Sequence, residues 1–211
     1  MSWNIVLGPP GTGKTTFLLN TVEELFGKGI QPYELAYLAF TKKAATEALT
    51  RAVDKFDYDD DQLIYFRTIH SLCYFWQGLT RSDILDRKDL RAFSKLVGER
   101  INSAWDGENL MALNSVGDNM LFLENMARNT CKTYRDSWNT AQSDISWIHF
   151  DWFCSSYNNF KQTNFLMDYT DMLSGFMNFD TKPPLKALIV DEAQDLSALQ
   201  WKCIHKLAQG L

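Results

Sequence analysis

The chain has 211 residues with a net charge of −5, 45% hydrophobic and 22% charged residues, which predicts a globular protein and argues against binding nucleic acid by general charge attraction. No apolar run approaches the roughly 20 residues that span a bilayer and no signal peptide is seen, so no membrane partner is expected. The four cysteines are widely scattered, which argues against a disulfide framework and favours a cytoplasmic location, in a host cytoplasm if the gene is phage-encoded.

The first predicted element is an apolar strand over residues 3–7, followed by a glycine-rich turn and a helix over 16–25. The turn has the G-x-x-x-x-G-K-[ST] spacing of a phosphate-binding loop, whose backbone N–H groups point at a phosphate from the positive end of a helix. Lys14 is expected to contact the terminal phosphates and the Thr15 hydroxyl to bind Mg²⁺. The residues expected to hold the nucleotide are Gly8, Pro9, Pro10, Gly11, Thr12, Gly13, Lys14, Thr15 and Thr16.

A second apolar strand is predicted over residues 34–40, and Thr41 can cap the helix that follows it. Strands that alternate with helices at this spacing imply a parallel sheet, which binds ligands at the carboxyl ends of its strands. Phe40 and the lysines after Thr41 could stack a base and hold a phosphate there. The residues fit equally well with Phe40 in the core and the lysines on a solvated surface.

A third strand is predicted over residues 63–66, and Arg67, Thr68 and His70 follow it. All of these are hydrogen-bond donors suited to a phosphate backbone, and they come just after a strand end. A lone histidine is more often structural, so this position alone does not assign a role to His70.

From residue 78 to residue 165 no strand pattern appears, and helices are predicted over 86–100, 116–133 and 145–161. This segment is interpreted as a helical insertion between two strands of a core made of residues 1–77 and 166–211. Its dense aromatic residues favour packing of a small core over stacking on single-stranded nucleic acid. They include Trp105, Trp138, Trp147, Phe150, Trp152, Phe153, Tyr157 and Phe160.

A short helix is predicted from residue 168, an apolar strand over 185–190, and a final helix over 197–211. The strand ends in adjacent carboxylates, and together with the phosphate loop this pair indicates hydrolysis of a nucleoside triphosphate. Asp191 can hold the hydration shell of Mg²⁺, and Glu192 can orient and deprotonate the attacking water.

These segments together resemble the N-terminal ATPase domain of superfamily 1 DNA helicases of the UvrD/Rep type. The matching segments are residues 8–15 (motif I), 39–45 (motif Ia, T-F-T-N-K-A-A), 68–73 (T-F-H-S-L-C), 168–173 (D-F-x-D-L-L) and 191–195 (motif II, D-E-x-Q-D). The resemblance implies a RecA-like P-loop domain with a helical insertion, ATP and Mg²⁺ as cofactors, and single-stranded DNA as the partner. It also implies that Phe40, Thr41 and His70 face DNA and that Gln194 couples the nucleotide to DNA.

The chain departs from the family pattern at several points. Lys42 stands where the family has Asn, which would make a DNA contact more electrostatic, and Ile69 replaces an aromatic residue. The upstream glutamine motif that reads adenine is absent, so base selectivity stays open. Motifs III to VI and the second RecA-like domain are also missing, so we expect this chain alone to bind Mg-ATP, to hydrolyse it poorly and not to unwind DNA.

The favoured function is therefore the N-terminal domain of an ATP-dependent DNA helicase that translocates on single strands. Two other classes stay open: another P-loop enzyme such as a nucleotide kinase, and a non-enzymatic nucleotide- or nucleic-acid-binding module. A kinase would need an acceptor site and an arginine-bearing lid, and the sequence reveals neither. The expected catalytic residues are Lys14, Glu192 and Gln194, the expected metal ligands are Thr15 and Asp191, and the expected DNA contacts are Phe40, Thr41, Lys42, Arg67, Thr68 and His70.

Overall fold

The computed structural model describes residues 3–9, 11–102, 115–141 and 144–211. The chain divides into two compact units. The first unit is formed by residues 1–76, 179–196 and 200–211, and the second by residues 77–178 and 197–199. Compared with the helical insertion expected over 78–165, the second unit also includes the helix that begins after Asp168.

The first unit is built on a three-stranded parallel sheet with the strand order β2-β1-β3. Its main elements are α1 (Lys14–Gly27), β1 (Leu35–Ala39), α2 (Lys42–Phe56), β2 (Phe66–Thr68), α3 (Ile69–Trp76), β3 (Ala187–Val190) and most of α9 (Ala198–Ala208), with short 3-10 helices at Pro32–Glu34 and Ala193–Asp195. A parallel sheet with intervening helices confirms the predicted α/β fold, which is consistent with a RecA-like domain.

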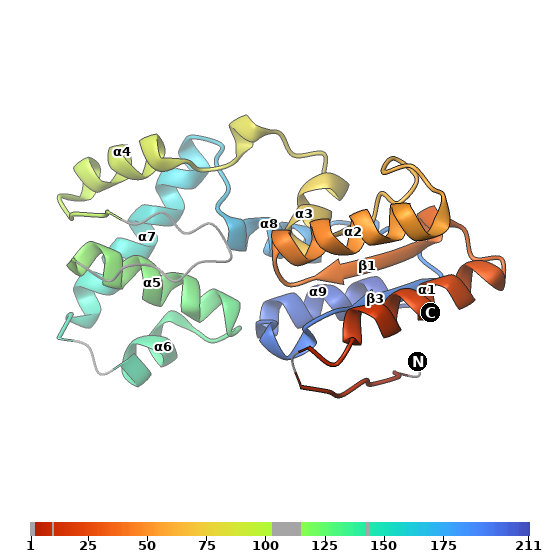
Figure 1. Cartoon of the computed structure of the whole chain (residues 1–211). Coiled ribbons are helices and arrows are strands. Elements are labelled where there is room, and N and C mark those ends of the chain that lie inside the picture. Colours follow the sequence, from red (N-terminus) through yellow and green to blue (C-terminus); the bar gives the residue numbers. More distant parts are fainter. Residues whose placement is uncertain (1–2, 10, 103–114, 142–143) are drawn as a thin grey trace. The chain divides into compact units, whose positions relative to one another are not determined.

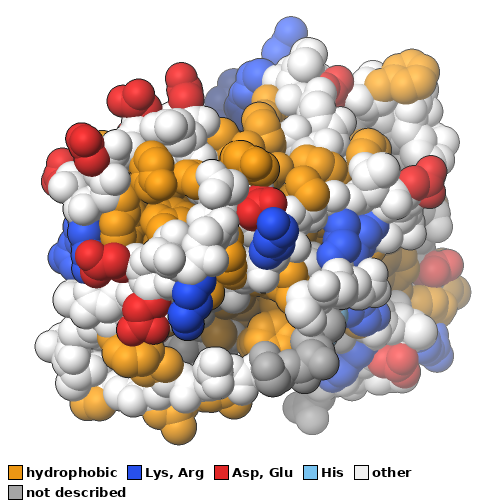
Figure 2. Space-filling model, turned by 90° about the vertical axis from the view of Figure 1, so that its right-hand side faces the viewer, with side chains coloured by type: hydrophobic (Ala, Val, Ile, Leu, Met, Phe, Trp, Pro, Cys, Tyr) orange, Lys and Arg blue, Asp and Glu red, His pale blue; other side chains and the backbone are white. Residues whose placement is uncertain are grey.

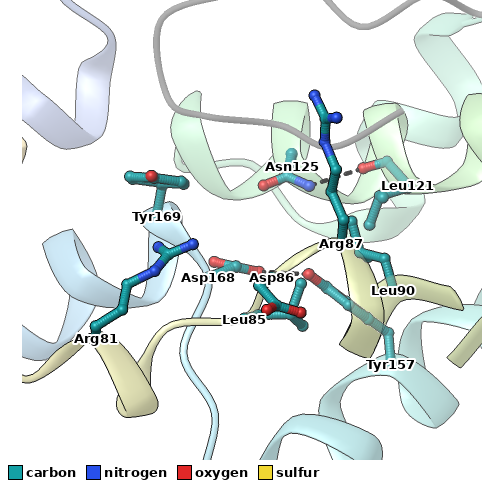
Figure 3. A pocket seen from close by; sticks show the side chains of 10 residues that line it. All are labelled: Arg81, Leu85, Asp86, Arg87, Leu90, Leu121, Asn125, Tyr157, Asp168 and Tyr169. Carbon is teal, nitrogen blue, oxygen red and sulfur yellow. Dashed lines mark hydrogen bonds between the residues drawn. The ribbon is translucent and has the colours of Figure 1, made fainter. Parts of the chain in front are cut away.

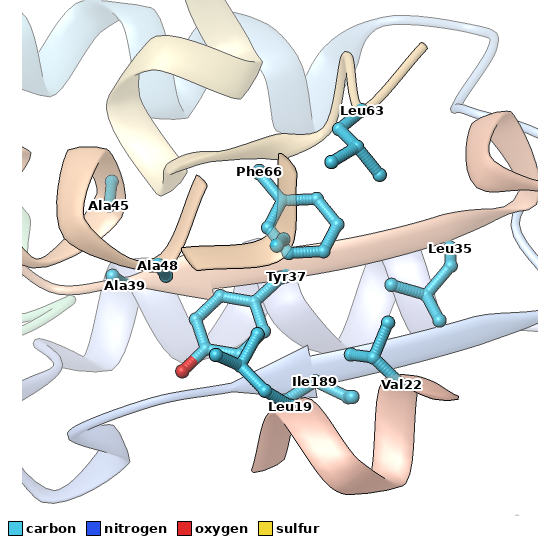
Figure 4. Packing of buried hydrophobic residues seen from close by; sticks show 11 residues of the cluster. Leu19, Val22, Leu35, Tyr37, Ala39, Ala45, Ala48, Leu63, Phe66 and Ile189 are labelled. Atoms are coloured by element: carbon cyan, nitrogen blue, oxygen red, sulfur yellow. The ribbon is translucent and has the colours of Figure 1, made fainter. Parts of the chain in front are cut away.

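Strand β1 lies in the middle of this sheet and is buried on both faces. Leu35 and Tyr37 point to one face, where they pack with Leu19 and Val22 of α1 and with alanines of α2 (Figure 4). Leu38 is equally buried on the opposite face, and α3 and α9 lie behind the sheet in the view of Figure 1. Helices on both faces explain why this strand reads as a nearly continuous apolar run rather than an alternating one.

The prediction of a first strand over residues 3–7 was wrong. Residues 3–9 form no strand, and Ile5 and Leu7 are 79% and 89% exposed. The Trp3 ring instead packs edge-on against Trp201 and His205 of α9, with ring centroids 6.5 Å and 5.9 Å apart. An apolar pattern supplies no hydrogen-bond partner, and the prolines that follow cannot donate to a ladder, so the pattern alone does not fix a strand here.

Strand β2 begins at Phe66, later than the predicted strand over 63–66. The Leu63 N–H donates to the Asp60 carbonyl and the Phe66 N–H donates to the Leu63 carbonyl, so this segment forms turns before it joins the sheet. The prediction placed the apolar run correctly but could not foresee these local bonds, which use N–H groups that a ladder would require.

The second unit is helical. It contains α4 (Arg87–Val97), α5 (Val116–Asn129), α6 (Tyr134–Ala141), α7 (Trp147–Thr163) and α8 (Tyr169–Asn178), with a short 3-10 helix at Arg81–Asp83. Phe93, Phe150, Phe153 and Tyr157 are buried in its core, whereas Trp152 is 47% exposed. Core packing is thus confirmed as the role of the central aromatic residues of this unit. Trp105 lies outside the described residues.

Figure 2 shows a face on which acidic, basic and hydrophobic side chains are interspersed rather than gathered by sign. Ion pairs in the first unit follow the same mixture, since Lys186 pairs with Glu34 at 2.7 Å and Lys55 pairs with Glu23 at 2.9 Å. Mixed charge of this kind does not favour a polyanion over other ligands on this face.

Candidate functional site

The carboxyl ends of the three strands meet at one edge of the sheet. The register pairs Ala39 with Thr68 across β1 and β2, and Leu38 with Val190 across β1 and β3. The chain leaves β3 at Asp191, beside the segments that leave the other two strands. Because this is the edge at which parallel sheets bind ligands, the tertiary structure gathers the predicted residues where a site is expected.

The glycine-rich loop enters α1 through left-handed backbone. Gly11 has a φ of 78°, and Gly13, the residue that precedes α1, has a φ of 82°. Glycine adopts such angles without steric cost, so the geometry of the loop requires glycine at these positions. The Thr12 hydroxyl donates to the Pro9 carbonyl at 2.8 Å and closes the loop on itself. Pro10 lies outside the described residues.

Lys14 opens α1 with its side chain folded over the loop. Its Nζ donates to the Gly8 carbonyl at 3.0 Å and to the Pro9 carbonyl at 3.4 Å. The same Nζ lies 3.9 Å from Oε1 of Glu192 at the end of β3. The ammonium group therefore stands between the loop and a carboxylate, while Thr16, further along α1, is exposed.

Thr15 and Asp191 join the two halves of the predicted nucleotide site. They lie 176 residues apart in the chain, and the Thr15 hydroxyl donates to Oδ2 of Asp191 at 3.4 Å. Asp191 is buried, and the Tyr37 hydroxyl donates to the same Oδ2 atom at 2.8 Å. Octahedral Mg²⁺ binds oxygens at 2.0–2.1 Å, which sets neighbouring ligand oxygens about 3 Å apart. The Thr15 and Asp191 oxygens therefore fit a shared Mg²⁺ ion.

Tyr37 was not among the predicted site residues. The signal that could have found it is a single phenol inside the otherwise aliphatic strand Leu35–Ala39. A buried tyrosine usually needs a partner for its hydroxyl, and here that partner is the predicted metal ligand.

Glu192 follows Asp191 in a left-handed conformation with a φ of 51°. This conformation is uncommon for a residue with a side chain and is often found at functional sites. The Gln194 amide donates to Oε2 of Glu192 at 2.6 Å, so these two candidate catalytic residues are in direct contact. Glu192 thus contacts Lys14 through one carboxylate oxygen and Gln194 through the other.

Of the predicted DNA contacts after β1, Phe40 and Thr41 are half-buried and Lys42 is exposed. The Thr41 hydroxyl accepts a hydrogen bond from the Ala44 N–H at 3.1 Å and caps α2, as the sequence predicted. Thr41 therefore has a structural role as the cap of α2, whereas the exposed Lys42 places a positive charge in the first turn of that helix.

The other predicted DNA contacts lie in β2 and at the start of α3, and their side chains contact the protein itself. The Thr68 hydroxyl is buried and accepts a hydrogen bond from the Ser71 N–H at 3.2 Å. The Arg67 guanidinium lies 4.3 Å from the centre of the Phe75 ring and donates to the Ile64 carbonyl. Burial, with a smaller contribution from Lys42, lowers the pKa of His70 to about 4. His70 is therefore a neutral imidazole at pH 7.

The segment that resembles D-F-x-D-L-L is part of a buried ion cluster in the second unit. The Asp168 and Asp171 carboxylates each accept a hydrogen bond from the other residue's backbone N–H, which caps α8. Arg128 and Lys161 each form ion pairs with both carboxylates, and Arg128 also pairs with Glu124 at 2.8 Å. These ion pairs connect α5, α7 and α8, and no local sequence pattern predicts them.

A separate cavity of about 190 Å³ lies in the second unit (Figure 3). Asp168 and Asn125 line it, with Tyr169 and the exposed residues Arg81 and Arg87. No residue of the phosphate loop or of motif II lines this cavity, so it is distinct from the nucleotide residues of the first unit. Its two carboxylates, Asp86 and Asp168, and its two arginines do not favour a ligand of one charge.

Two absences apply to the part of the chain that the structure describes. Within that part, no group of three or more His, Cys, Asp or Glu side chains is arranged to hold a metal ion. Among the same residues, no helix combines the length and the apolarity that crossing a bilayer requires. The candidate Mg²⁺ site consists of the Asp191 carboxylate and the Thr15 hydroxyl, as in sites where phosphates and water supply the other ligands.

Comparison with known proteins supports one family. The family model described as the UvrD/REP helicase N-terminal domain matches residues 2–211. A curated relative described as a probable DNA helicase, from Mycoplasma pneumoniae, is 28% identical over 227 aligned residues. The alignment covers 97% of this chain and 41% of the relative, so the chain spans less than half of that protein's length. Because the family model matches nearly the whole chain, the chain belongs to the UvrD/REP helicase N-terminal domain family.

Proposed function

We propose that the chain binds Mg-ATP at the carboxyl edge of its parallel sheet and hydrolyses it. The observation that carries this proposal is the meeting of Lys14 and Thr15 with Asp191 and Glu192, which are far apart in the sequence. A phosphate loop joined to a strand that ends in two carboxylates has the parts that phosphoryl transfer to water requires. The Lys14 contacts with two neutral carbonyls are ones that a charged phosphate oxygen would replace.

Each residue has a proposed role. Lys14 binds the β- and γ-phosphates, and Thr15 with Asp191 holds Mg²⁺, which neutralises phosphate charge when it is bound. Glu192 orients the attacking water and accepts its proton, since its carboxylate lies next to the Lys14 ammonium at the loop. Gln194 contacts Glu192 directly and in this proposal couples the state of the nucleotide to the DNA-binding residues.

The proposed DNA path begins where the chain leaves β1. Phe40 would stack on a base, and Lys42 would contact a phosphate from the first turn of α2. His70 would add a neutral hydrogen-bond donor from α3. Arg67 and Thr68 belong to the same proposal. Because their side chains already form hydrogen bonds within the protein, we propose that they stabilise the residues that line the DNA path rather than contact DNA themselves.

For the protein as a whole we propose an ATP-dependent DNA helicase that moves on single-stranded DNA in the cytoplasm. The family match and the relative described as a probable DNA helicase support this reading. The chain covers 41% of that relative's length, so a longer protein can supply further residues to the nucleotide. An arginine at the transferring phosphate is worth about 10³–10⁵ in rate. We therefore propose that this chain alone turns ATP over slowly and needs a second RecA-like domain for full activity.

The nucleotide site can be tested with a fluorescent ATP analogue titrated against the 211-residue chain. Lys14→Ala should weaken Mg-nucleotide binding by about tenfold or more, because it removes a charge-assisted contact to phosphate. Lys28→Ala removes the same charge just beyond the far end of α1 and should change nothing. Normal binding by the Lys14 variant would reject the site assignment.

The DNA path can be tested by fluorescence anisotropy of a labelled single-stranded oligonucleotide, with and without a non-hydrolysable Mg-ATP analogue. Salt-sensitive binding that shifts with nucleotide is the expected result. Nucleotide binding without any DNA binding would contradict the proposed path on this chain.

A further inference from the structure

Tyr37 is a fully buried tyrosine in the middle of the central strand. The register pairs it with Phe66 on β2 and with Ile189 on β3. Its ring stacks on the Phe66 ring, with centroids 5.3 Å apart and an angle of 11° between the planes. Packing on both sides leaves the ring little freedom to turn, so the position of its hydroxyl is set by the sheet.

The same register brings the Tyr37 hydroxyl to Asp191. Asp191 lies two residues beyond Ile189, so both side chains point to the face on which Tyr37 lies. Diagonal neighbours on one face of a sheet are within reach of a long aromatic side chain. Figure 4 shows the Tyr37 oxygen pointing away from Leu35, toward the carboxyl end of β1. There it donates to Oδ2 of Asp191 at 2.8 Å.

The remaining bonds of Asp191 fix its backbone and its second oxygen. The Asp191 N–H donates to the Leu38 carbonyl at 2.8 Å, and the Glu192 N–H donates to Oδ1 at 3.0 Å. The Tyr37 hydroxyl is thus a donor that holds the carboxylate at Oδ2, the oxygen that also faces Thr15. Hydrogen bonds to a ligating carboxylate set its orientation and tune its metal affinity.

The Tyr37 hydroxyl is a neutral donor, so replacing it removes one hydrogen bond to Asp191 and no charge.

We propose that Tyr37 is a positioning residue for the cation site, whose hydroxyl holds the Asp191 carboxylate beside Thr15 and so sets the Mg²⁺ dependence of nucleotide binding. This inference rests on the proposed function and adds to it a residue outside the phosphate loop and motif II. Tyr37 itself touches neither nucleotide nor metal in this account, since its contact is with Asp191.

The test uses the 211-residue chain and a fluorescent ATP analogue, titrated at a series of Mg²⁺ concentrations and in excess EDTA. Tyr37→Phe keeps the ring and its packing but removes the donor. The Mg²⁺ concentration that half-saturates the binding signal should rise about tenfold, the effect of one hydrogen bond to a charged group. Affinity in EDTA should not change, because only the cation-dependent part of binding involves Asp191. A merely structural defect would lower both.

Tyr65→Phe is the matched control. Tyr65 is also buried, but its ring lies edge-on to the Phe75 ring of α3, with centroids 6.4 Å apart. Its loss of a hydroxyl should leave the Mg²⁺ dependence unchanged. A comparable rise in both variants would overturn the positioning role of Tyr37.

A double-mutant cycle with Asp191→Asn keeps the inference falsifiable if Tyr37→Phe lowers stability. In the Asp191→Asn background there is no charged carboxylate to position, so adding Tyr37→Phe should have no further effect on Mg²⁺ dependence. Additive effects would overturn the inference while leaving the proposed function standing. A wild-type chain whose nucleotide binding ignores Mg²⁺ would reject the proposed function, and this inference with it.

Discussion

Arg128 on α5 and Asp168 before α8 are 40 residues apart in the chain and form an ion pair inside the second unit. Burial alone would raise the pKa of Asp168, but Arg128 and Lys161 outweigh it and hold that pKa well below its usual range. Burial raises the pKa of Glu124, which also pairs with Arg128. Arg128 thus compensates the charge of several buried carboxylates at once.

Arg128→Met should therefore destabilise the second unit strongly. Removing one partner of a buried ion pair costs about 3–5 kcal/mol, because the remaining charges stay buried without compensation. Urea unfolding at pH 7, followed by circular dichroism of the helices, measures this loss. Arg91→Met, at an exposed position of α4, is the control and should cost less than about 0.5 kcal/mol. Equal stability of the two variants would show that the cluster is not what holds these helices together.

Gly13→Ala should weaken binding of Mg-nucleotide by about tenfold while leaving the fold intact. Its φ of 82° is in the left-handed region, which costs a residue with a side chain about 1–2 kcal/mol. The loop should relax to avoid that cost and lose the alignment of its N–H groups. Gly27→Ala, at the other end of α1, meets nothing with its added Cβ and should bind nucleotide normally. Titration of both variants with the fluorescent ATP analogue measures their affinities for nucleotide. Equal affinities would show that nucleotide binding does not require glycine at position 13.

Lys42→Gln should weaken binding of a single-stranded oligonucleotide and reduce its salt dependence. A lysine that contacts a phosphate contributes about one unit to the slope of log affinity against log salt. The control is Lys28→Gln, which makes the same change of net charge just beyond the far end of α1. Anisotropy titrations at several salt concentrations give both slopes. If the Lys28 and Lys42 variants lose the same slope, the effect is one of net charge and not of a DNA contact.

His70 should make stability depend on pH below neutrality. Its pKa is about 4 in the folded chain and about 6.5 in an unfolded one, so the unfolded state binds the proton more readily. The stabilisation that results is fully present above pH 6.5 and is lost as the pH falls from there to about 4. At pH 5 the loss reaches about 2 kcal/mol.

His70→Gln should flatten that part of the curve of unfolding free energy against pH. A curve for the His70 variant that stays parallel to that of the wild type would mean that His70 does not carry the titration.

The sequence predicted the features that depend on neighbouring residues. The loop spacing fixes the left-handed glycines at Gly11 and Gly13, and Thr41 caps α2 through the Ala44 N–H three residues on. The central strand was predicted at the correct place. Helices cover both of its faces, so its residues form the nearly continuous apolar run that is typical of a buried parallel strand. From these parts the sequence also predicted which strand ends would share an edge.

The same reasoning failed where the deciding partner lies far along the chain. Residues 3–7 have the composition of a strand, but Trp3 packs on α9 instead. Asp168 could be matched to a motif, but Arg128 and Lys161 reach it from other helices.

The sequence by itself thus determined which chemistry we propose for the site, through the spacing of a phosphate loop and a pair of adjacent carboxylates after an apolar strand. Only the tertiary structure decided which side chains support that chemistry, and Tyr37 is the clearest case. Nothing near Tyr37 in the sequence points to Asp191, which lies 154 residues away. The contact exists because parallel strands in one register place diagonal side chains on the same face, and register follows from packing of the whole sheet rather than from any local pattern.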